Sequence, residues 1–310
     1  MSDPVYPPEV VATLGDLLRL EGVSAARRLL PDRPVYSLLA GRHSSKLRGR
    51  GLDFEEVRQY VGGDDIRNID WRVTARTGRT HSKVFNEERE RPVFIVLDQS
   101  SRMFFGSQKY TKSVIAAHAA AISAFYTLKR GDRVGGIVFG DNGNDYVSPR
   151  RNRDSLLYFL QAIAKWNGLL PGRKEVGRAP MDEILRTTAL LTPHDYVITL
   201  IGDWSGLTAE QRQSIKAMGN HNDVILAHIY DAFETGLPDG RLLFTDGRDQ
   251  ILWSNNRGGT GEAWRKGFEE LKRDLSVEFR GTRIPVVFLN TIESVDKQLK
   301  QELWTRSTTS

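Results

Sequence analysis

The fold is decided by the stretch Pro92–Met103, which reads PVFIVLDQSSRM. Its first part, Val93–Leu97, is an unbroken run of large apolar residues that ends at an acidic residue, Asp98. A short apolar run of this kind is typical of a strand in a parallel sheet, where both faces are buried. The polar residues that follow would then lie at the carboxyl end of a strand, which is where open α/β sheets bind their ligands.

Strands and helices alternate along the chain after this strand. We predict an alanine-rich helix over 110–129, a strand over 133–139, and a second buried strand over 196–201 that is followed by Asp203. This alternation predicts an α/β fold with a doubly wound, mostly parallel sheet of the Rossmann type, covered by helices on both faces. Two pieces depart from it: 146–148 is predicted to return antiparallel, and 242–253 is predicted to form a β-hairpin.

Composition excludes several classes of protein. The chain has 310 residues, no cysteine and a formal net charge of +5. Without cysteine there can be no disulfide, thiolate nucleophile or cysteine-bound zinc. The net charge is small for a nucleic-acid-binding protein, so we do not expect nucleic acid as a partner. No apolar run approaches the about 18 residues that span a bilayer, and no secretory signal is visible. We therefore expect a cytoplasmic protein without a membrane span. The common enzyme motifs are also missing, so we expect no catalytic activity.

The stretch 36–90 has a different character, because it is rich in arginine and glycine. We predict a short helix capped by Asp53 with Glu56 as its capping-box partner, and strands over 70–75 and 81–85. An isolated two-stranded hairpin is marginally stable in water. We therefore expect the hairpin at about 236–255 to join these strands in one small, discontinuous β-containing domain.

Three carboxylates, Asp64, Asp65 and Asp70, are close together in this stretch. They could serve a metal-dependent nuclease or another nucleic-acid-binding protein. The reading we favour is structural: the aspartates bond to local backbone amides in turns and pair with nearby arginines. On that reading the stretch is a recognition surface without a catalytic centre.

The strongest chemical signal lies at the strand ends. Asp98 and Asp203 each follow an apolar strand, and with the Ser100 hydroxyl they could hold a hard divalent cation such as Mg²⁺ in a weak site. The run Asp98–Arg102 resembles the D-x-S-x-S element of the metal-ion-dependent adhesion site in von Willebrand factor A (vWA) domains.

A second resemblance extends over nearly the whole chain from Gly41. The runs GRHSS (41–45), RGRGLDF (48–54), GDDIRNIDW (63–71), ARTG (75–78) and EER (87–89) are similar, in the same order, to the signature of the domain of unknown function 58 (DUF 58) family. The resemblance implies a vWA-like domain, and it implies a partner, since members of this family commonly accompany MoxR-type AAA+ ATPases. The charged and aromatic residues of the matching motifs are Arg48, Arg50, Arg58, Asp64, Asp65, Arg67, Asp70, Trp71 and Arg76.

The chain departs from the family's metal site in two places. Arg102 stands where the second serine of D-x-S-x-S is expected, and the loop 167–179 lacks the threonine that vWA domains contribute. A guanidinium can bond to two carboxylates through planar hydrogen bonds and repels a divalent cation. We therefore predict that Arg102 contacts Asp98, Asp203 or both, and that the metal site is degenerate. Arg173, Lys174 and Arg178 are expected at the same edge of the sheet, where they would suit an acidic partner.

These observations predict three segments: an N-terminal helical segment (1–35), a small β-containing domain (36–90 with about 236–255) and a vWA-like domain (91–235 with 256–310). We interpret the chain as a non-enzymatic protein-interaction module without a cofactor, an adaptor for a MoxR-type AAA+ ATPase in assembly, maturation or stress response. Two alternatives stay open. One is a nucleic-acid-binding protein or nuclease using Asp64, Asp65 and Asp70. The other is a metal-dependent adhesion-type binder using Asp98, Ser100 and Asp203.

Overall fold

The computed structural model describes residues 6–25, 52–87, 91–171, 181–236, 241–245, 250–254, 260–282 and 284–299. The chain divides into two compact units. The larger consists of Met1–Gly41 and Arg91–Ser310, and the smaller of Arg42–Glu90. No helix among these described residues is long and apolar enough to cross a membrane.

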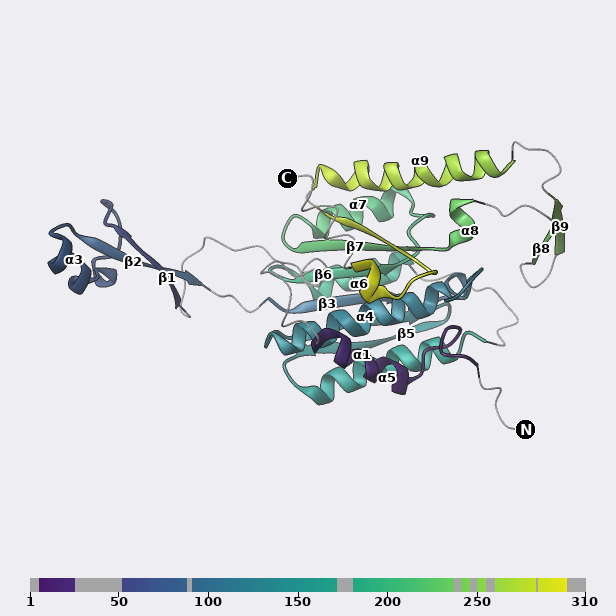
Figure 1. The fold of residues 1–310 in the computed structure, drawn as a ribbon, viewed down its shortest axis with the longest axis horizontal. Coiled ribbons are helices and arrows are strands. Elements are labelled where there is room, and N and C mark those ends of the chain that lie inside the picture. The colour runs from purple at the N-terminus through teal and green to yellow at the C-terminus, as the bar shows by residue number, and fades with distance from the viewer. Residues whose placement is uncertain are drawn as a thin grey trace. The chain divides into compact units, whose positions relative to one another are not determined.

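A six-stranded sheet forms the centre of the larger unit (Figure 1). Every pair of neighbouring strands is parallel except the last, in which β5 runs antiparallel to β4. The doubly wound, mostly parallel sheet predicted from the sequence is therefore confirmed, including its antiparallel edge strand. In spatial order the strands are β10 (Val286–Asn290), β7 (Asp223–Tyr230), β6 (Val197–Gly202), β3 (Val93–Asp98), β4 (Val134–Gly140) and β5 (Gly143–Arg150).

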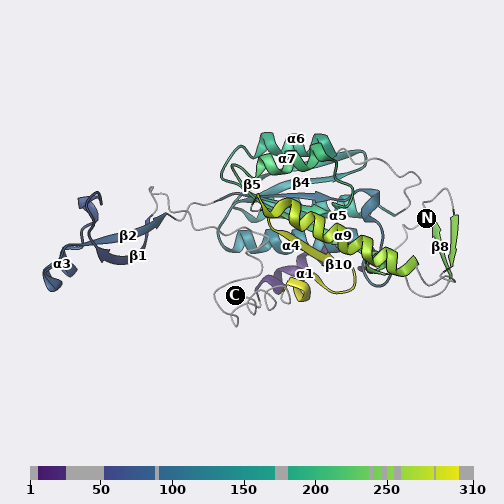
Figure 2. The same cartoon turned by 90° about the horizontal axis from the view of Figure 1, so that it is seen from above.

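Helices cover both faces of this sheet (Figures 1 and 2). One face packs against α1 (Leu14–Ala25), α4 (Lys112–Lys129) and α5 (Arg153–Gly168), and the other against α6 (Met181–Leu191), α7 (Ala209–Met218) and α9 (Thr260–Arg280). Side chains alternate across a strand. In β3, Ile95 and Leu97 therefore enter the first core, while Phe94 and Val96 enter the second.

The N-terminal segment is part of the larger unit. Leu17 of α1 is fully buried in the core beneath α4 and α5. The backbone N–H of Ala12 donates a 2.7 Å hydrogen bond to Asn167 Oδ1, which ties the segment to the end of α5. A helix this short is marginal in isolation, so tertiary packing is what stabilises it.

The smaller unit is a β-hairpin whose connection carries two short helices. Strand β1 (Leu52–Gln59) pairs antiparallel with β2 (His81–Glu87), and between them lie the 3₁₀ helix η1 (Ile66–Asn68) and α3 (Trp71–Thr77). The strand predicted over 81–85 is confirmed. The helix predicted after Asp53 is wrong, because 52–59 is a strand.

The strand predicted over 70–75 is also wrong, because Asp70 begins a helix there. Its side chain accepts hydrogen bonds from the backbone N–H groups of Arg72 and Val73, as an N-cap residue does. Gly78 ends the helix in the left-handed conformation, with φ of 69°.

The second predicted hairpin is present as β8 (Arg241–Thr245) and β9 (Gln250–Ser254). Its assignment needs a correction. The hairpin forms a two-stranded sheet of its own and groups with the larger unit, whereas we expected it in one sheet with residues 36–90. Its position in the chain explains this. The hairpin follows α8 (Ala232–Thr235) and precedes α9 closely in sequence, and both of these helices belong to the larger unit.

Candidate functional site

Four aspartates mark the carboxyl edge of the central sheet, one at the end of each of four neighbouring parallel strands. Asp98 ends β3, Asp141 follows β4, Asp203 follows β6 and Asp231 follows β7. All four are buried. The sequence analysis selected Asp98 and Asp203 as site residues and missed the roles of the other two, although each also directly follows an apolar strand.

Asp98 and Ser100 form the floor of the site, and each keeps one polar atom without a partner. The Ser100 N–H donates to Asp98 Oδ1 at 2.8 Å. Within the described part of the chain, Asp98 Oδ2 and Ser100 Oγ are buried and make no hydrogen bond. Complete burial raises the pKa of Asp98 to about 6, against the opposite effects of the Ser100 hydrogen bond and the Arg102 charge.

Gly202 makes room for this arrangement. A Cβ atom at this position would lie 2.8 Å from Asp98 Cβ and 3.1 Å from the Trp204 ring. A side chain there would push the two strand ends apart, so β6 has to end in glycine directly before Asp203.

The sequence analysis missed Lys112, which is the central cation of the site. Thr111 caps α4, and Lys112 is the first residue of that helix. Its ammonium lies 2.9 Å from Asp203 Oδ2 and also forms an ion pair with Glu234. The Lys112 side chain is only 6% exposed, so this cation belongs to the interior of the site.

Ionisation in this cluster follows from the ion pairs. Burial alone would lower the pKa of Lys112, but Asp203 and Glu234 raise it above its usual value. Burial alone would raise the pKa of Asp203, but the Lys112 ammonium holds it well below its usual range. For Glu234, burial raises the pKa by more than the Lys112 ammonium lowers it, so the pKa of Glu234 lies above its usual value. Lys112 and Asp203 are therefore a charged pair at neutral pH.

Asp231 positions Glu234 toward Lys112. Asp231 and Glu234 form a capping box on α8, in which the Glu234 carboxylate accepts the Asp231 N–H at 3.0 Å. Asp231 also accepts hydrogen bonds from the Ser107 N–H at 3.0 Å and from the Thr291 hydroxyl at 2.5 Å. One aspartate thus connects the loops after β3, β7 and β10.

Arg102 approaches Asp203 from the solvent side. Its Nη2 donates to the main-chain oxygen of Asp203 at 3.2 Å and lies 3.8 Å from Asp203 Oδ1. The expected contact with Asp203 is present, but Lys112 lies closer to the carboxylate and is far more buried. Arg102 is 40% exposed, which leaves its guanidinium accessible to a partner.

The loop after β6 is held by buried aromatic groups. Trp204 is fully buried, and its indole N–H donates to the Ala227 carbonyl at 2.8 Å. The Trp204 backbone N–H donates to His228 Nδ1 at 3.0 Å, which leaves the imidazole proton on Nε2. Burial lowers the pKa of His228 to about 4, although Asp203 opposes the shift, so this ring is neutral at pH 7.

Apolar side chains are exposed beside this charged centre. Phe105, on the loop between β3 and α4, is 43% exposed and packs edge-on against Phe233. Ile292, after β10, is 41% exposed. The edge therefore combines an internally paired charge cluster with exposed Phe105, Ile292 and Arg102.

The three carboxylates of the smaller unit make local contacts. Asp64 forms an ion pair with Arg58, in which Arg58 Nη2 lies 2.6 Å from Asp64 Oδ1. Asp65 caps η1, and Asp70 caps α3. No group of three or more His, Asp or Glu side chains in the described residues could hold a metal ion. The structural reading of these carboxylates is confirmed for their bonds to backbone amides. The expected pairing with nearby arginines holds for Arg58 and Asp64, whereas Arg67 and Arg72, which we also expected as partners, make no such pair within the described residues.

Several predicted site residues lie outside the described residues. They are Arg48 and Arg50 of the family motif and the basic residues Arg173, Lys174 and Arg178.

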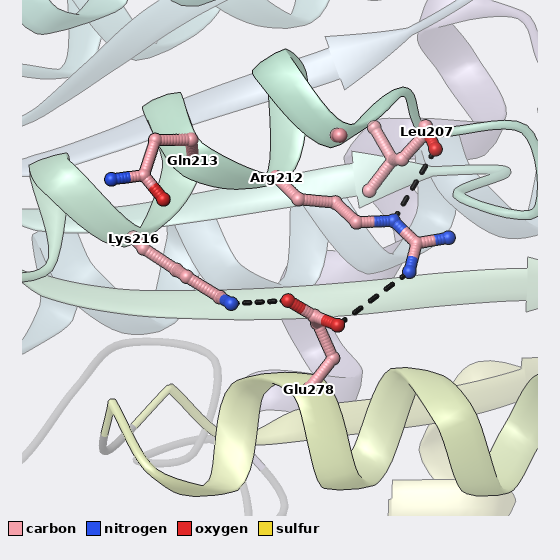
Figure 3. A pocket seen from close by; sticks show the side chains of 6 residues that line it. Leu207, Arg212, Gln213, Lys216 and Glu278 are labelled. Carbon is pink, nitrogen blue, oxygen red and sulfur yellow. Dashed lines mark hydrogen bonds and ion pairs between the residues drawn. The ribbon is translucent and has the colours of Figure 1, made fainter.

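A pocket of about 420 Å³ between α7 and α9 is the other candidate (Figure 3). Its charged groups pair with one another: Lys216 forms an ion pair with Glu278, and Arg212 Nη1 lies 3.7 Å from the same carboxylate. Arg212 also donates to the Leu207 carbonyl at 3.3 Å. These contacts hold α9 against α7, so we assign the pocket a structural role.

The strand order with its antiparallel edge strand is a doubly wound α/β fold, as the resemblance to vWA-like domains implied. Residues 56–278 match the family described as "Protein of unknown function DUF58". The chain therefore belongs to the DUF58 family, as its motifs predicted.

Other relatives and folds are similar to this chain. Uncharacterized proteins of Mycobacterium bovis and Mycobacterium tuberculosis are 25% identical to it over 292 residues, which is 93% of this chain and 90% of each relative. BatB from Bacteroides thetaiotaomicron, a conserved hypothetical protein, aligns with a TM-score of 0.42 and 17% identity over 70% of this chain and 99% of its own. The vWA domain of SpRpn10 aligns with a TM-score of 0.38 and 14% identity over 69% and 95%.

Proposed function

We propose that the protein is a non-enzymatic interaction module that binds a protein partner at the carboxyl edge of its central sheet, without a resident metal ion or cofactor. The observation that carries this proposal is the Lys112 ammonium between Asp203 and Glu234. In a vWA-type metal site Asp203 would face a divalent cation. Here its carboxylate already faces two positive groups, Lys112 and Arg102, so a third cation would be repelled.

The surroundings of this cluster support a protein partner. Aromatic residues and arginine are enriched at protein interfaces and supply much of the binding free energy. Phe105 and Arg102 are both exposed on the loop after β3, and Ile292 is exposed on the loop after β10. Arg102 offers a guanidinium to a partner's carboxylate, which is the reverse of a metal site that a partner's carboxylate completes.

The finer part of the proposal is the partner. The resemblance to the DUF58 family implies a MoxR-type AAA+ ATPase in the cytoplasm, with this chain as its adaptor in assembly, maturation or stress response. This assignment rests on the association of families, since a fold alone does not determine a function.

The proposal is tested by measuring binding of the full chain to the MoxR-type ATPase of its own organism in the presence of ATP. Binding is measured in a buffer with Mg²⁺ and in a buffer with EDTA, and a control that does not depend on metal reports whether the ATPase still binds nucleotide. We expect Arg102→Glu and Phe105→Ala each to weaken binding about tenfold or more. Arg265→Glu, an exposed arginine of α9, is the matched control and should change it less than about twofold. Equal binding by all variants would contradict the proposed face.

One observation favours a second candidate function, a metal-dependent binder. Asp98 Oδ2 and Ser100 Oγ are buried oxygens without a partner, and both are ligand types that Mg²⁺ accepts. Partner binding that requires Mg²⁺ and is lost in Asp98→Asn would favour this candidate over the metal-independent one.

A further inference from the structure

A second candidate binding surface lies in the smaller unit, on the connection between β1 and β2. All three of its carboxylates hold the local backbone in place. Asp64 accepts the Val61 N–H at 3.0 Å, Asp65 accepts the Arg67 N–H at 2.9 Å, and Asp70 accepts the N–H groups of Arg72 and Val73. Acidic side chains in these positions stabilise a turn or the first turn of a helix by accepting hydrogen bonds from backbone N–H groups. Their oxygens therefore point toward the backbone.

The arginines of the connection are not paired with these carboxylates in the part of the chain that the structure describes. Arg58, at the end of β1, pairs with Asp64, as we expected of the arginines in this stretch. Four other arginines make no side-chain hydrogen bond or ion pair within the described part of the chain, and all four are exposed. They are Arg67, Arg72, Arg76 and Arg79.

Large apolar side chains are exposed on the same short connection. Trp71 is 70% exposed, Ile66 69% and Val61 59%. On α3, Arg72 and Arg76 are four residues apart and share a face, and Trp71 begins the neighbouring row. Val73 and Thr74 are instead half-buried, and Thr74 Oγ1 accepts the His81 N–H at 3.0 Å, so the face with Trp71, Arg72 and Arg76 is the one left open.

We propose that the exposed side chains of this connection, Arg67, Arg72, Arg76 and Arg79 with Val61, Ile66 and Trp71, together form a surface that binds an acidic amphipathic segment of a partner protein. Guanidinium groups bind carboxylates through paired hydrogen bonds. Exposed aliphatic and indole side chains bury best against the apolar side chains of such a segment. This surface belongs to the smaller unit and the carboxyl edge of the sheet to the larger one. The proposal therefore concerns other residues, with a different chemistry, than the proposed function does.

A protein segment fits this surface better than a nucleic acid. Nucleic-acid surfaces use arginine with flat aromatic rings on which bases stack. Here two of the three exposed apolar residues, Val61 and Ile66, are aliphatic and give no stacking platform. Their burial requires apolar side chains on the partner.

Fluorescence anisotropy with the full-length protein tests the proposal. The probe is a fluorescein-labelled amphipathic peptide of glutamate and leucine, and the control peptide has glutamine in place of every glutamate. We expect saturable binding of the glutamate peptide alone. Arg72→Gln combined with Arg76→Gln should weaken it about tenfold, and Trp71→Ala should weaken it to a similar degree.

The matched control carries Arg265→Gln with Arg280→Gln, two exposed arginines of α9, and removes the same charge from the other unit. It should bind the peptide within about twofold of wild type. The proposal is overturned by an equal loss in this control, by equal binding of the glutamine peptide, or by unchanged binding in the Arg72, Arg76 variant. It is also overturned if an oligothymidylate or phosphatidylglycerol vesicles bind at this surface while the glutamate peptide does not.

Discussion

The two acidic clusters of this protein have similar composition and opposite arrangements. At the carboxyl edge of the central sheet, Asp203 and Glu234 pair with a buried lysine, and the charges are satisfied inside the fold. In the smaller unit, Asp65 and Asp70 bond to backbone N–H groups, and the arginines beside them stay exposed. The partners of the carboxylates therefore decide which positive charges remain available for binding.

This comparison also locates where charge contributes to stability. A buried ion pair is costly to break because the remaining charge has no solvent to stabilise it. An exposed arginine without a partner contributes little to the folded state. We therefore expect the largest effects of substitution at the sheet edge and the smallest on the arginine face of α3.

Lys112→Met should have the largest effect. It leaves Asp203 and Glu234 buried without their common cation, which should lower the free energy of unfolding by about 3–5 kcal/mol. Chemical denaturation with circular dichroism measures it. Lys129→Met, an exposed lysine at the end of the same helix, is the control and should change stability by less than about 0.5 kcal/mol. A Lys112 effect as small as the control's would mean that the ion pairs do not organise the site.

Asp98→Asn should have the opposite sign. The folded-state pKa of Asp98 is about 6, above the ordinary value of about 4, so the wild type loses stability as pH rises between these values. The amide cannot ionise, and the variant should therefore be more stable than wild type by roughly 3 kcal/mol at pH 7.5 in EDTA, with no gain at pH 4. Denaturation curves at both pH values measure this. A loss of stability at pH 7.5 would show that the Asp98 carboxylate has a partner cation.

Asp70→Ala should have a local effect. It removes the acceptor for the N–H groups of Arg72 and Val73, so amides of α3 should exchange hydrogen faster while those of β3 stay unchanged. Asp70→Asn keeps an acceptor at the cap and should behave nearly as wild type. If Asp70→Asn instead abolished a Mg²⁺-dependent cleavage of DNA or RNA, the nuclease alternative would replace the structural assignment.

Arg72→Gln combined with Arg76→Gln should have the smallest effect on stability. Neither arginine has an ion pair within the described residues, so thermal denaturation should show a change of less than about 0.5 kcal/mol. A larger loss of stability would mean that these arginines stabilise the fold, which would contradict their assignment to partner binding.

Much of the larger unit could be predicted from the sequence, because its signals are local and strong. The buried run Val93–Leu97 and the strand before Asp203 fix the sheet, and acids directly after apolar strands mark its carboxyl edge. The smaller unit was harder to predict. Asp53 and Glu56 match a capping box and predict a short helix there, but residues 52–59 form a strand. Asp70 and Gly78, which cap α3 at its two ends, are the stronger helix signal.

The key contact of the site could not be read from the sequence. Lys112 and Asp203 are 91 residues apart, and they meet because α4 begins beside the end of β6. Arg102 was chosen as the nearest cation along the chain to Asp98, but proximity in sequence does not show which side chain reaches the interior. The role of Glu234 depends in turn on the capping box with Asp231.

The most direct test of the metal-independent site is a calorimetric titration of Mg²⁺ and Mn²⁺ into protein that has been stripped with EDTA and desalted. Because Lys112 and Arg102 already face Asp203, the wild type should show no binding in the micromolar range, and Arg102→Ser should improve binding only slightly while Lys112 remains. Micromolar binding by the wild type at one ion per chain, abolished by Asp98→Asn, would contradict the account.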